Sequence, residues 1–240
     1  AARNEFAAAH SLPARTWKFD WQDTSTRASM AGRTEADDLC DVGQYTAVNA
    51  SCFGTFDPGD VTDVLQAALN SSAGELIIDL PIGTWMVRPL FASSSNMHIV
   101  FQPGITLLAK KDSFHGPHDC MLSIESVTNV TIDGNGAILQ MRRDDYAWGT
   151  CSECQKYSRS EWRHGLYVSQ SDSVTVRRLT IVETGGDGLY IGGTDTGASR
   201  NVHISDCVLD RNYRQGMSVA TVANLLVERT VFSNTNGTKP

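Results

Sequence analysis

Hydrophobic and polar residues alternate in short runs over most of the chain. One pattern, a polar residue and a glycine followed by a short apolar strand, recurs at residues 164–168, 187–191 and 215–219. The glycines of neighbouring copies are 23 and 28 positions apart. Units of roughly 20–30 residues with short strands are typical of a solenoid, in which each unit buries its apolar side against the next.

A second pattern places an asparagine or serine before a short apolar run. It occurs at residues 96–99, 129–132, 173–176, 201–204 and 224–227. Only turns join these runs, and no crossover helices separate them, so the strands are predicted to pair in parallel from coil to coil. The sequence therefore predicts an all-β fold, a parallel β-helix, in which the repeated asparagines stack along the axis.

One helical pattern precedes the strands. Val61, Val64, Leu65, Ala68 and Leu69 recur with helical spacing behind acidic residues that suit a helix start. An open solenoid end exposes unpaired strands and bare core, which natural proteins cover. We therefore expect a short capping helix at the N-terminal end of the coil.

The repeats divide the chain into two parts. Residues 1–55 show no repeat and are predicted to form an N-terminal extension or wrapping segment, and residues 56–240 form the β-helix. Because the sequence stops just after a strand pattern, we expect the solenoid to be incomplete there, with further protein covering its C-terminal end. Residues 142–162 interrupt the repeats with charged and aromatic side chains, and such excursions from a rigid scaffold are usually functional.

Composition narrows the choice of partners and compartment. The net charge is −7, which argues against nucleic acid as the main partner. No apolar run reaches the roughly 18 residues that span a bilayer. Six cysteines form an even set and Asn-x-Ser/Thr triplets recur, so we predict a secreted, extracellular protein.

The same residues give candidate modifications. Cys40 and Cys52 bracket a short loop and are a candidate disulfide pair, although connectivity cannot be read from sequence alone. The other disulfide candidates are Cys120, Cys151 and Cys154, with Cys207 either joining them or remaining a buried thiol. The expected glycan acceptors are Asn49, Asn70 and Asn236, whereas Asn129 belongs to the stacked column.

The region after residue 55 resembles a known superfamily. An acidic start and a Gln-Ala helix lead to a strand that ends at residues 81–85, Pro-Ile-Gly-Thr-Trp, and residues 129–136 read Asn-Val-Thr-Ile-Asp-Gly-Asn-Gly. Both segments resemble the pectin-lyase-like superfamily, particularly its polygalacturonase-like branch, where a tyrosine replaces Trp85. The resemblance covers roughly residues 55–240 and implies a right-handed parallel β-helix and a carbohydrate-related activity.

The catalytic motifs of polygalacturonases match much less well. That branch carries Asn-Thr-Asp, Asp-Asp, Gly-His-Gly and Arg-Ile-Lys, in this order. Residues 185–188 only loosely resemble the first motif, and residues 164–166 are similar to the third but precede it. No Asp-Asp or Arg-Ile-Lys follows in the repeats, so the resemblance does not imply polygalacturonase activity itself.

Stacking predicts a column of functional side chains. His164, Asp187 and Gln215 each precede the glycine of the first pattern, so they are expected to lie about 4.8 Å apart on successive coils. Glycoside hydrolysis uses two carboxyl groups roughly 5–9.5 Å apart. Asp187 with Asp210 or Glu183 is the candidate pair, tuned by His164. The alternative is that these are ordinary turn residues, since Asp-Gly is common in turns.

A lyase would use the same column differently. Elimination from a uronate needs a base and a positive charge over the carboxylate. His164 or Tyr213 is the candidate base, and Arg214 or Arg211 the candidate neutralising group. Hydrolysis needs no cofactor, whereas this alternative admits Ca²⁺ held by Asp172, Asp187, Asp206 or Asp210.

Metal binding is a separate alternative. Cys151 and Cys154 have the spacing of metal ligands, and His115, His118 and Cys120 form a second group. The sequence lacks a second well-spaced cysteine pair, and secretion favours disulfides. We therefore predict no metal site.

Aromatic side chains suit the apolar faces of sugar rings. The candidate substrate-binding residues are Trp148, Tyr157, Trp162, Tyr213 and Gln215, while Tyr167 and Tyr190 either join them or form a structural ladder. We expect a secreted, polysaccharide-directed protein, best interpreted as a glycoside hydrolase-like enzyme. The alternative from another class is a non-catalytic structural or adhesive β-helix, which would apply if Asp187 is covered rather than facing an open groove.

Overall fold

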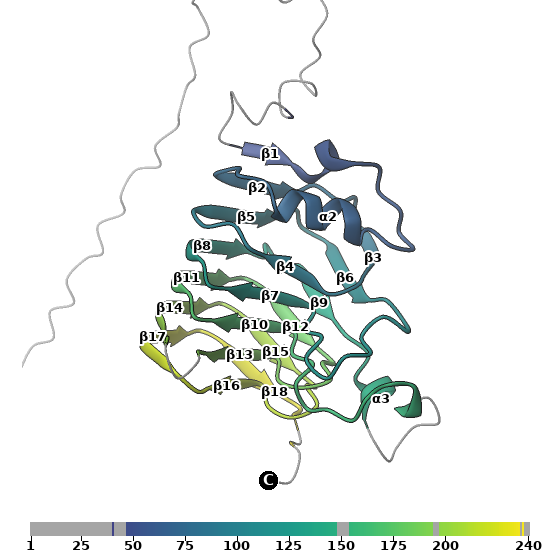
Figure 1. Cartoon of the computed structure of the whole chain (residues 1–240), viewed down its shortest axis with the longest axis vertical. Coiled ribbons are helices and arrows are strands. Elements are labelled where there is room, and N and C mark those ends of the chain that lie inside the picture. The colour runs from purple at the N-terminus through teal and green to yellow at the C-terminus, as the bar shows by residue number, and fades with distance from the viewer. Residues whose placement is uncertain (1–39, 41–46, 148–153, 194–196, 236, 238–240) are drawn as a thin grey trace, which may run out of the picture. The chain divides into compact units, whose positions relative to one another are not determined.

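The structure, a computed structural model, describes residues 40, 47–147, 154–193, 197–235 and 237. Within these residues short strands wind into successive coils, and their stacking forms three parallel sheets (Figure 1). Each full coil runs from the five-stranded sheet to the seven-stranded sheet and then to the six-stranded sheet. The predicted all-β class and the parallel β-helix are confirmed.

The strands of each sheet are named here in chain order. The seven-stranded sheet contains β1 (Ala47–Asn49), β2 (Glu75–Ile78), β5 (Met97–Phe101), β8 (Thr128–Asp133), β11 (Asp172–Arg177), β14 (Ser199–Ser205) and β17 (Val222–Glu228). The six-stranded sheet contains β3 (Gly83–Val87), β6 (Ile105–Ala109), β9 (Ile138–Gln140), β12 (Thr180–Val182), β15 (Val208–Asp210) and β18 (Val231–Ser233). The five-stranded sheet contains β4 (Leu90–Ala92), β7 (Leu122–Glu125), β10 (Leu166–Ser169), β13 (Leu189–Gly192) and β16 (Met217–Val219).

The core consists of identical positions stacked from coil to coil. In the seven-stranded sheet, Ile99, Ile132, Val176 and Ile204 are register partners on successive strands. All four are buried, and β-branched side chains pack well on such a pleated surface. Burial of one such side chain contributes roughly 1.5–3 kcal/mol relative to exposure, which fixes the register of each new coil on the last.

A helix covers the first coils. α2 (Thr62–Leu69) follows the short helix η1 (Ala50–Phe53) and buries Leu65, Ala68 and Leu69 in the core. Figure 1 shows α2 lying beside β2 and β4 at the N-terminal end of the coil. The predicted helix is therefore present. The strand β1 already pairs with β2, so the described solenoid begins before the predicted boundary at residue 56.

The excursion between β9 and β10 contains α3 (Arg143–Tyr146) and η2 (Cys154–Lys156). A fully buried cation, Arg163, ties it to the coil. Its Nε donates to the Phe114 carbonyl at 2.8 Å, and its Nη2 donates to the Ser158 carbonyl at 2.8 Å. The guanidinium also lies over the rings of Tyr146 and Tyr157, at 5.3 and 5.8 Å. These contacts fix the chain just before His164.

The cysteines follow the sequence prediction only in part. Cys40 and Cys52 form the expected disulfide, which is compatible with an oxidising compartment. Cys120, a disulfide candidate, is instead a free buried thiol that donates to the Trp162 carbonyl at 3.5 Å. Cys207 is a free buried thiol too. Cys151 and the side chain of Cys154 lie outside the described part of the chain.

Other predictions about the chain stay open. Asn70 is exposed and Asn49 half-buried, while Asn236 and Trp148 lie outside the described residues. None of the described helices is both apolar enough and long enough to cross a bilayer. Further protein over the C-terminal end stays a prediction.

The repeated asparagines form hydrogen-bonded pairs, as expected. The Asn129 amide donates to Asn96 at 3.1 Å, and the Asn224 amide donates to Asn201 at 3.0 Å. The backbone of these residues is left-handed, with φ between 50° and 61°, which asparagine tolerates well. Ser173, also left-handed at φ 57°, interrupts the column, and the Asn201 amide bonds Asp172 instead.

Ser173→Asn is expected to raise the free energy of unfolding by about 0.5–1 kcal/mol. Asparagine favours the left-handed backbone at this position, and its amide would join Asn129 to Asn201. Urea denaturation followed by circular dichroism measures the change. Thr175→Asn, on the same strand without a left-handed backbone, is the matched control, and an equal gain there would contradict the ladder explanation.

Candidate functional site

The stacking of β10, β13 and β16 brings the predicted column together. The Gly165 N–H donates to the Asp187 carbonyl at 3.1 Å. One coil further, the Gly188 N–H donates to the Gln215 carbonyl at 2.9 Å. With the strands in register, His164, Asp187 and Gln215 occupy equivalent places on successive coils.

His164 and Asp187 are in direct contact. The Nδ1 atom of His164 accepts a hydrogen bond from the Asp187 backbone N–H at 2.9 Å and lies 3.5 Å from Asp187 Oδ2. A ring nitrogen that accepts a hydrogen bond carries no proton, so the imidazole is neutral and its proton is on Nε2. Burial, together with the charges of Arg214 and His118, lowers the pKa of His164 to about 3. The contact is therefore not an ion pair.

The Asp187 carboxyl group is completely enclosed. Its exposed fraction is 0%, and neither oxygen accepts a well-formed hydrogen bond within the described residues. Burial raises the pKa of Asp187. The nearby Ser218 side chain, the Arg214 guanidinium 3.7 Å from Oδ2 and the Gln215 backbone favour the ionised form and offset the effect of burial only in part. A buried unpaired carboxylate is costly, so the group keeps its proton to a higher pH than an exposed aspartate. A carboxyl group held in this way has the property required of a general acid.

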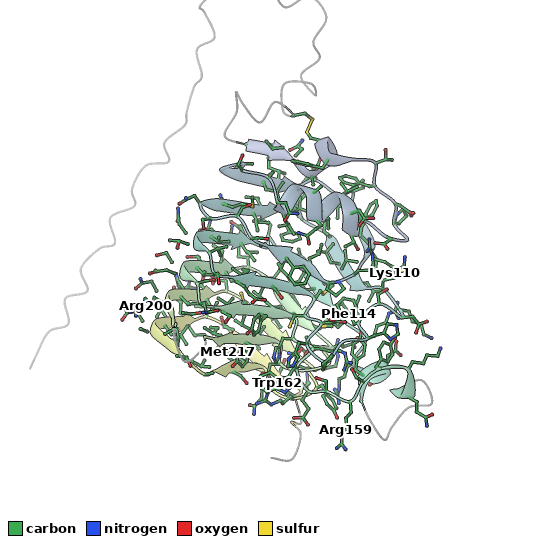
Figure 2. All side chains as sticks on the ribbon, viewed as in Figure 1. Lys110, Phe114, Arg159, Trp162, Arg200 and Met217 are labelled. Atoms are coloured by element: carbon green, nitrogen blue, oxygen red, sulfur yellow. A yellow bond between two sulfur atoms is a disulfide. The ribbon has the colours of Figure 1, made fainter. Side chains whose placement is uncertain are left out.

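Trp162 and Arg214 lie between this pair and solvent. The Trp162 ring packs edge-on against the His164 ring at 5.8 Å, and the Arg214 guanidinium lies 5.4 Å from the Trp162 ring centroid. Trp162 is 41% exposed, whereas His164 beneath it is 1% exposed. Trp162, labelled in Figure 2, is the last residue of the excursion. The end of the excursion thus supplies part of the cover over Asp187.

A cavity of about 310 Å³ adjoins this cover on the outer face of the five-stranded sheet. We call it the aromatic groove, and its lining residues are His164, Trp162, Tyr167, Phe91, His118, Cys120, Ser123 and Glu125. The rings of Tyr167 and Tyr190 stack at 5.3 Å, and the His164 ring stacks on Tyr190 at 5.0 Å. Aromatic faces with a few polar groups between them are typical of a small-ligand site and suit a sugar ring.

Two expected partners of Asp187 belong to a different face. Glu183 accepts hydrogen bonds from the Gln140 amide at 2.8 Å and from Arg211 Nε at 3.2 Å. Asp210 accepts hydrogen bonds from residues of the last coil, at 2.7 and 2.8 Å. Within the described residues no hydrogen bond or ion pair joins either carboxylate to Asp187. Both residues stand at the end of the six-stranded sheet, one corner before Asp187, and the candidate carboxylate pairs stay a prediction.

The expected sugar-stacking residues are corrected in part. Tyr157 is 2% exposed, its hydroxyl accepts a hydrogen bond from the Asp112 N–H, and its ring stacks on His115. It therefore anchors the excursion and cannot stack on a ligand. Tyr213 is half-buried and Gln215 is exposed, but neither lines the aromatic groove. Of the predicted set, Trp162 alone among the described residues does so.

Phe91, Ser123 and Glu125 of the groove were missed from sequence. Phe91 and Ser123 lie on β4 and β7 and are register partners of Tyr167 on β10, which the sequence did suggest. No glycine precedes the strands β4 and β7, unlike the later strands of the same sheet. The glycine pattern therefore did not identify Phe91. Glu161 was missed as well, and its negative charge also raises the pKa of Asp187, although burial is the larger cause.

The positions of the described side chains do not support the candidate metal sites. Within the described ranges, no three His, Cys, Asp or Glu side chains gather closely enough to hold a metal ion. Both ring nitrogens of His115 already face carbonyl oxygens, of Lys156 at 3.1 Å and Asp112 at 2.9 Å. The candidate zinc group of His115, His118 and Cys120 is therefore not assembled.

Comparison with known proteins identifies the family to which the chain belongs. A family model described as "Right handed beta helix region" matches residues 110–239, more than half of the chain. The chain belongs to this family. The coil is therefore right-handed, as the resemblance to the pectin-lyase-like superfamily implied. None of the curated proteins matches the sequence.

Solved structures of this fold are similar over most of the chain. An iota-carrageenase from A. fortis has 18% identity and a TM-score of 0.55, covering 75% of this chain and 39% of that chain. A polygalacturonase from Erwinia carotovora ssp. carotovora has 14% identity and a TM-score of 0.50, covering 74% and 61%. A candidate glycosyl hydrolase from Parabacteroides merdae has 15% identity and a TM-score of 0.53, covering 77% and 95%. The chain thus spans less than two thirds of the first two proteins, and identities this low establish the shared fold alone.

The imidazole of His164 is expected to stay neutral, with its proton on Nε2, far below pH 6.5. The unfolded chain takes up this proton near pH 6.5 and the folded chain only near pH 3, so the unfolded state binds more protons between these values. The free energy of unfolding should therefore fall as the pH drops from about 6.5 to about 3. Nitrogen-15 NMR of the ring across this range measures both nitrogens, with the urea-unfolded chain as control. A folded-state titration near pH 6.5 would contradict the geometry.

Proposed function

We propose that the protein binds a polysaccharide in the aromatic groove and hydrolyses a glycosidic bond with Asp187 as the proton donor. The observation that supports this most is a fully buried carboxyl group with a raised pKa and no well-formed hydrogen bond in the described residues, which contacts His164 directly beneath Trp162. Burial of such a group opposes folding, and its surroundings compensate that cost only in part. Perturbed groups of this kind beside a cleft are candidates for catalysis.

The outer face of the five-stranded sheet suits an extended ligand. Phe91, Tyr167 and Tyr190 stand in one outward column with Ser123, over four coils or about 14 Å. Phe91 and Trp162 are exposed at the groove, where their apolar faces can stack on sugar rings. An aromatic face of this length favours a polymer over a single sugar. The Cys40–Cys52 disulfide and the exposed glycan acceptor Asn70 are compatible with secretion. A secreted protein would meet such polymers outside the cell.

The chemistry would divide between two carboxyl groups. Asp187, protonated, gives its proton to the glycosidic oxygen as the bond to the sugar carbon breaks. Glu161, half-buried and close enough for its charge to act on Asp187, is the second carboxylate, which activates water or attacks the sugar carbon. Neutral His164 holds the Asp187 backbone through its Nδ1 and acts as a positioning residue. The Trp162 ring has to swing aside for Asp187 to reach a ligand.

Asp187→Asn is expected to reduce hydrolysis by roughly 10²–10⁴-fold while the variant still binds polysaccharide, because it removes the proton donor and leaves the groove intact. The assay is release of reducing ends from a panel of neutral, uronic and sulfated polysaccharides. Asp79→Asn, outside the groove, is the matched control. Wild-type turnover in Asp187→Asn would remove this residue from the mechanism.

The same variant separates lost chemistry from lost folding. Its free energy of unfolding at pH 7 should equal or exceed that of the wild type, because a buried ionisable group with a raised pKa has been removed. By linkage, this advantage should shrink as the pH falls toward 4, where the unfolded aspartate also becomes protonated. Wild-type activity should decline as the pH rises through the raised pKa of Asp187.

A non-catalytic glycan-binding role is the second candidate. It is favoured by one observation, the 0% exposure of Asp187 behind Trp162 and Arg214. Trp162→Ala tests the groove that both roles share, because it removes a stacking surface, and hydrolysis by the wild-type protein distinguishes the roles. Both roles expect polysaccharide affinity to fall about three- to tenfold, the effect of losing one aromatic contact. If the wild-type protein binds but releases no product from any polysaccharide of the panel, the binding role replaces hydrolysis.

A further inference from the structure

A second cavity, of about 360 Å³, lies away from the aromatic groove. Its lining residues come from α3, in the excursion, from β6, and from the ends of β9, β12 and β15 in the six-stranded sheet. We call it the charged cavity, and six charged residues line it: Arg142, Arg143, Arg211, Asp144, Asp145 and Glu183. The mechanism proposed above uses none of them. Its volume falls in the range of pockets that hold small ligands.

The side chains of the charged cavity are held in place by the scaffold. Arg211 Nε donates to Glu183 at 3.2 Å, and the Gln140 amide donates to the other Glu183 oxygen at 2.8 Å. Arg142 Nε donates to the Ala109 carbonyl at 2.8 Å. Arg143 Nη1 reaches the Arg211 carbonyl at 3.4 Å. Side chains fixed before binding lower the entropy cost of taking up a ligand.

One donor in the charged cavity lacks a partner. Arg143 Nε is buried, and no acceptor among the described residues bonds it. A buried N–H without an acceptor is costly, and the Arg143 side chain, which lines the cavity, relieves that cost if it turns its Nε toward a ligand oxygen. This atom distinguishes the cavity from a solvated group of surface charges.

The charges of the cavity select the chemistry of the ligand. Three arginines and three acidic residues line the cavity, so an anion would meet three negative charges and a cation three positive ones. An apolar ligand would displace water from all six charged groups and could not replace the hydrogen bonds that water makes to them. A hydroxyl group donates to a carboxylate and accepts from a guanidinium at the same time. Adjacent hydroxyls on a ring therefore match the alternating donors and acceptors of this cavity.

We propose that the charged cavity binds a neutral sugar unit, at a site separate from the aromatic groove. The site does not depend on hydrolysis at Asp187. It would hold a glycan on the outer face of the six-stranded sheet, and so give the protein two points of attachment to polysaccharide. Two attached sites on one rigid body increase the overall avidity well beyond either affinity alone.

The test uses neutral gluco-, manno- and galacto-oligosaccharides with the full chain. The NMR signal of Arg143 Nε, assigned by its absence in Arg143→Lys, is expected to shift on addition of at least one of them. Isothermal titration calorimetry should then give about tenfold weaker binding for Arg143→Lys, which keeps the charge but loses the planar donor fork. Arg200→Lys, an exposed arginine on β14, is the matched control and should bind like the wild type.

The outcomes distinguish this site from the groove. Trp162→Ala should keep the Arg143 Nε shift even if groove binding and hydrolysis are lost, whereas Arg143→Lys should keep the groove's activity toward polysaccharide. An Arg143 Nε signal unmoved by every neutral oligosaccharide would overturn the proposal. So would a larger shift with uronic or sulfated oligosaccharides than with any neutral one, because the ligand would then be an anion.

Discussion

Stacking of parallel strands in a fixed register is the constraint on which the rest of this molecule depends. Each coil buries apolar side chains against the same positions of the coils on either side, as Ile132 does between Ile99 and Val176. A slip of one residue would turn that apolar set outward, so burial holds the register firmly. Residues more than twenty positions apart in sequence thereby become neighbours. His164 and Asp187 meet for this reason alone.

The candidate site combines this regular coil with one irregular segment. The coil supplies His164 and Asp187, and the excursion between β9 and β10 supplies Trp162 as their cover. Arg163, between Trp162 and His164 in the chain, is buried among carbonyl oxygens and aromatic faces, so the excursion ends in a fixed place. A buried cation held through its Nε and Nη2 in this way transmits the rigidity of the coil to the groove wall. The unpaired carboxyl of Asp187 can then persist because the surrounding core outweighs its cost.

The repeats in the sequence predicted much of the fold but only part of the candidate site. Periodic apolar positions report burial directly, and so the coil, the capping helix and the column of His164 and Asp187 could be predicted. The excursion has no repeat, and nothing in its sequence signalled that Tyr157 is buried. The place of Glu183 relative to Asp187 could not be predicted, because its left-handed backbone, with φ of 55°, is set by the turn and not by the strand pattern. Phe91 was missed because its coil lacks the marking glycine.

The central claim is that register and enclosure leave Asp187 as a carboxyl group that holds its proton. Carbon-13 NMR of this carboxyl group, assigned by comparison with Asp187→Asn, measures its titration directly in the folded protein. The account predicts a pKa clearly above the ordinary value of 3.8, because burial outweighs the stabilisation of the ionised form by Ser218 and Arg214. A carboxyl group that ionises at or below that value would contradict it.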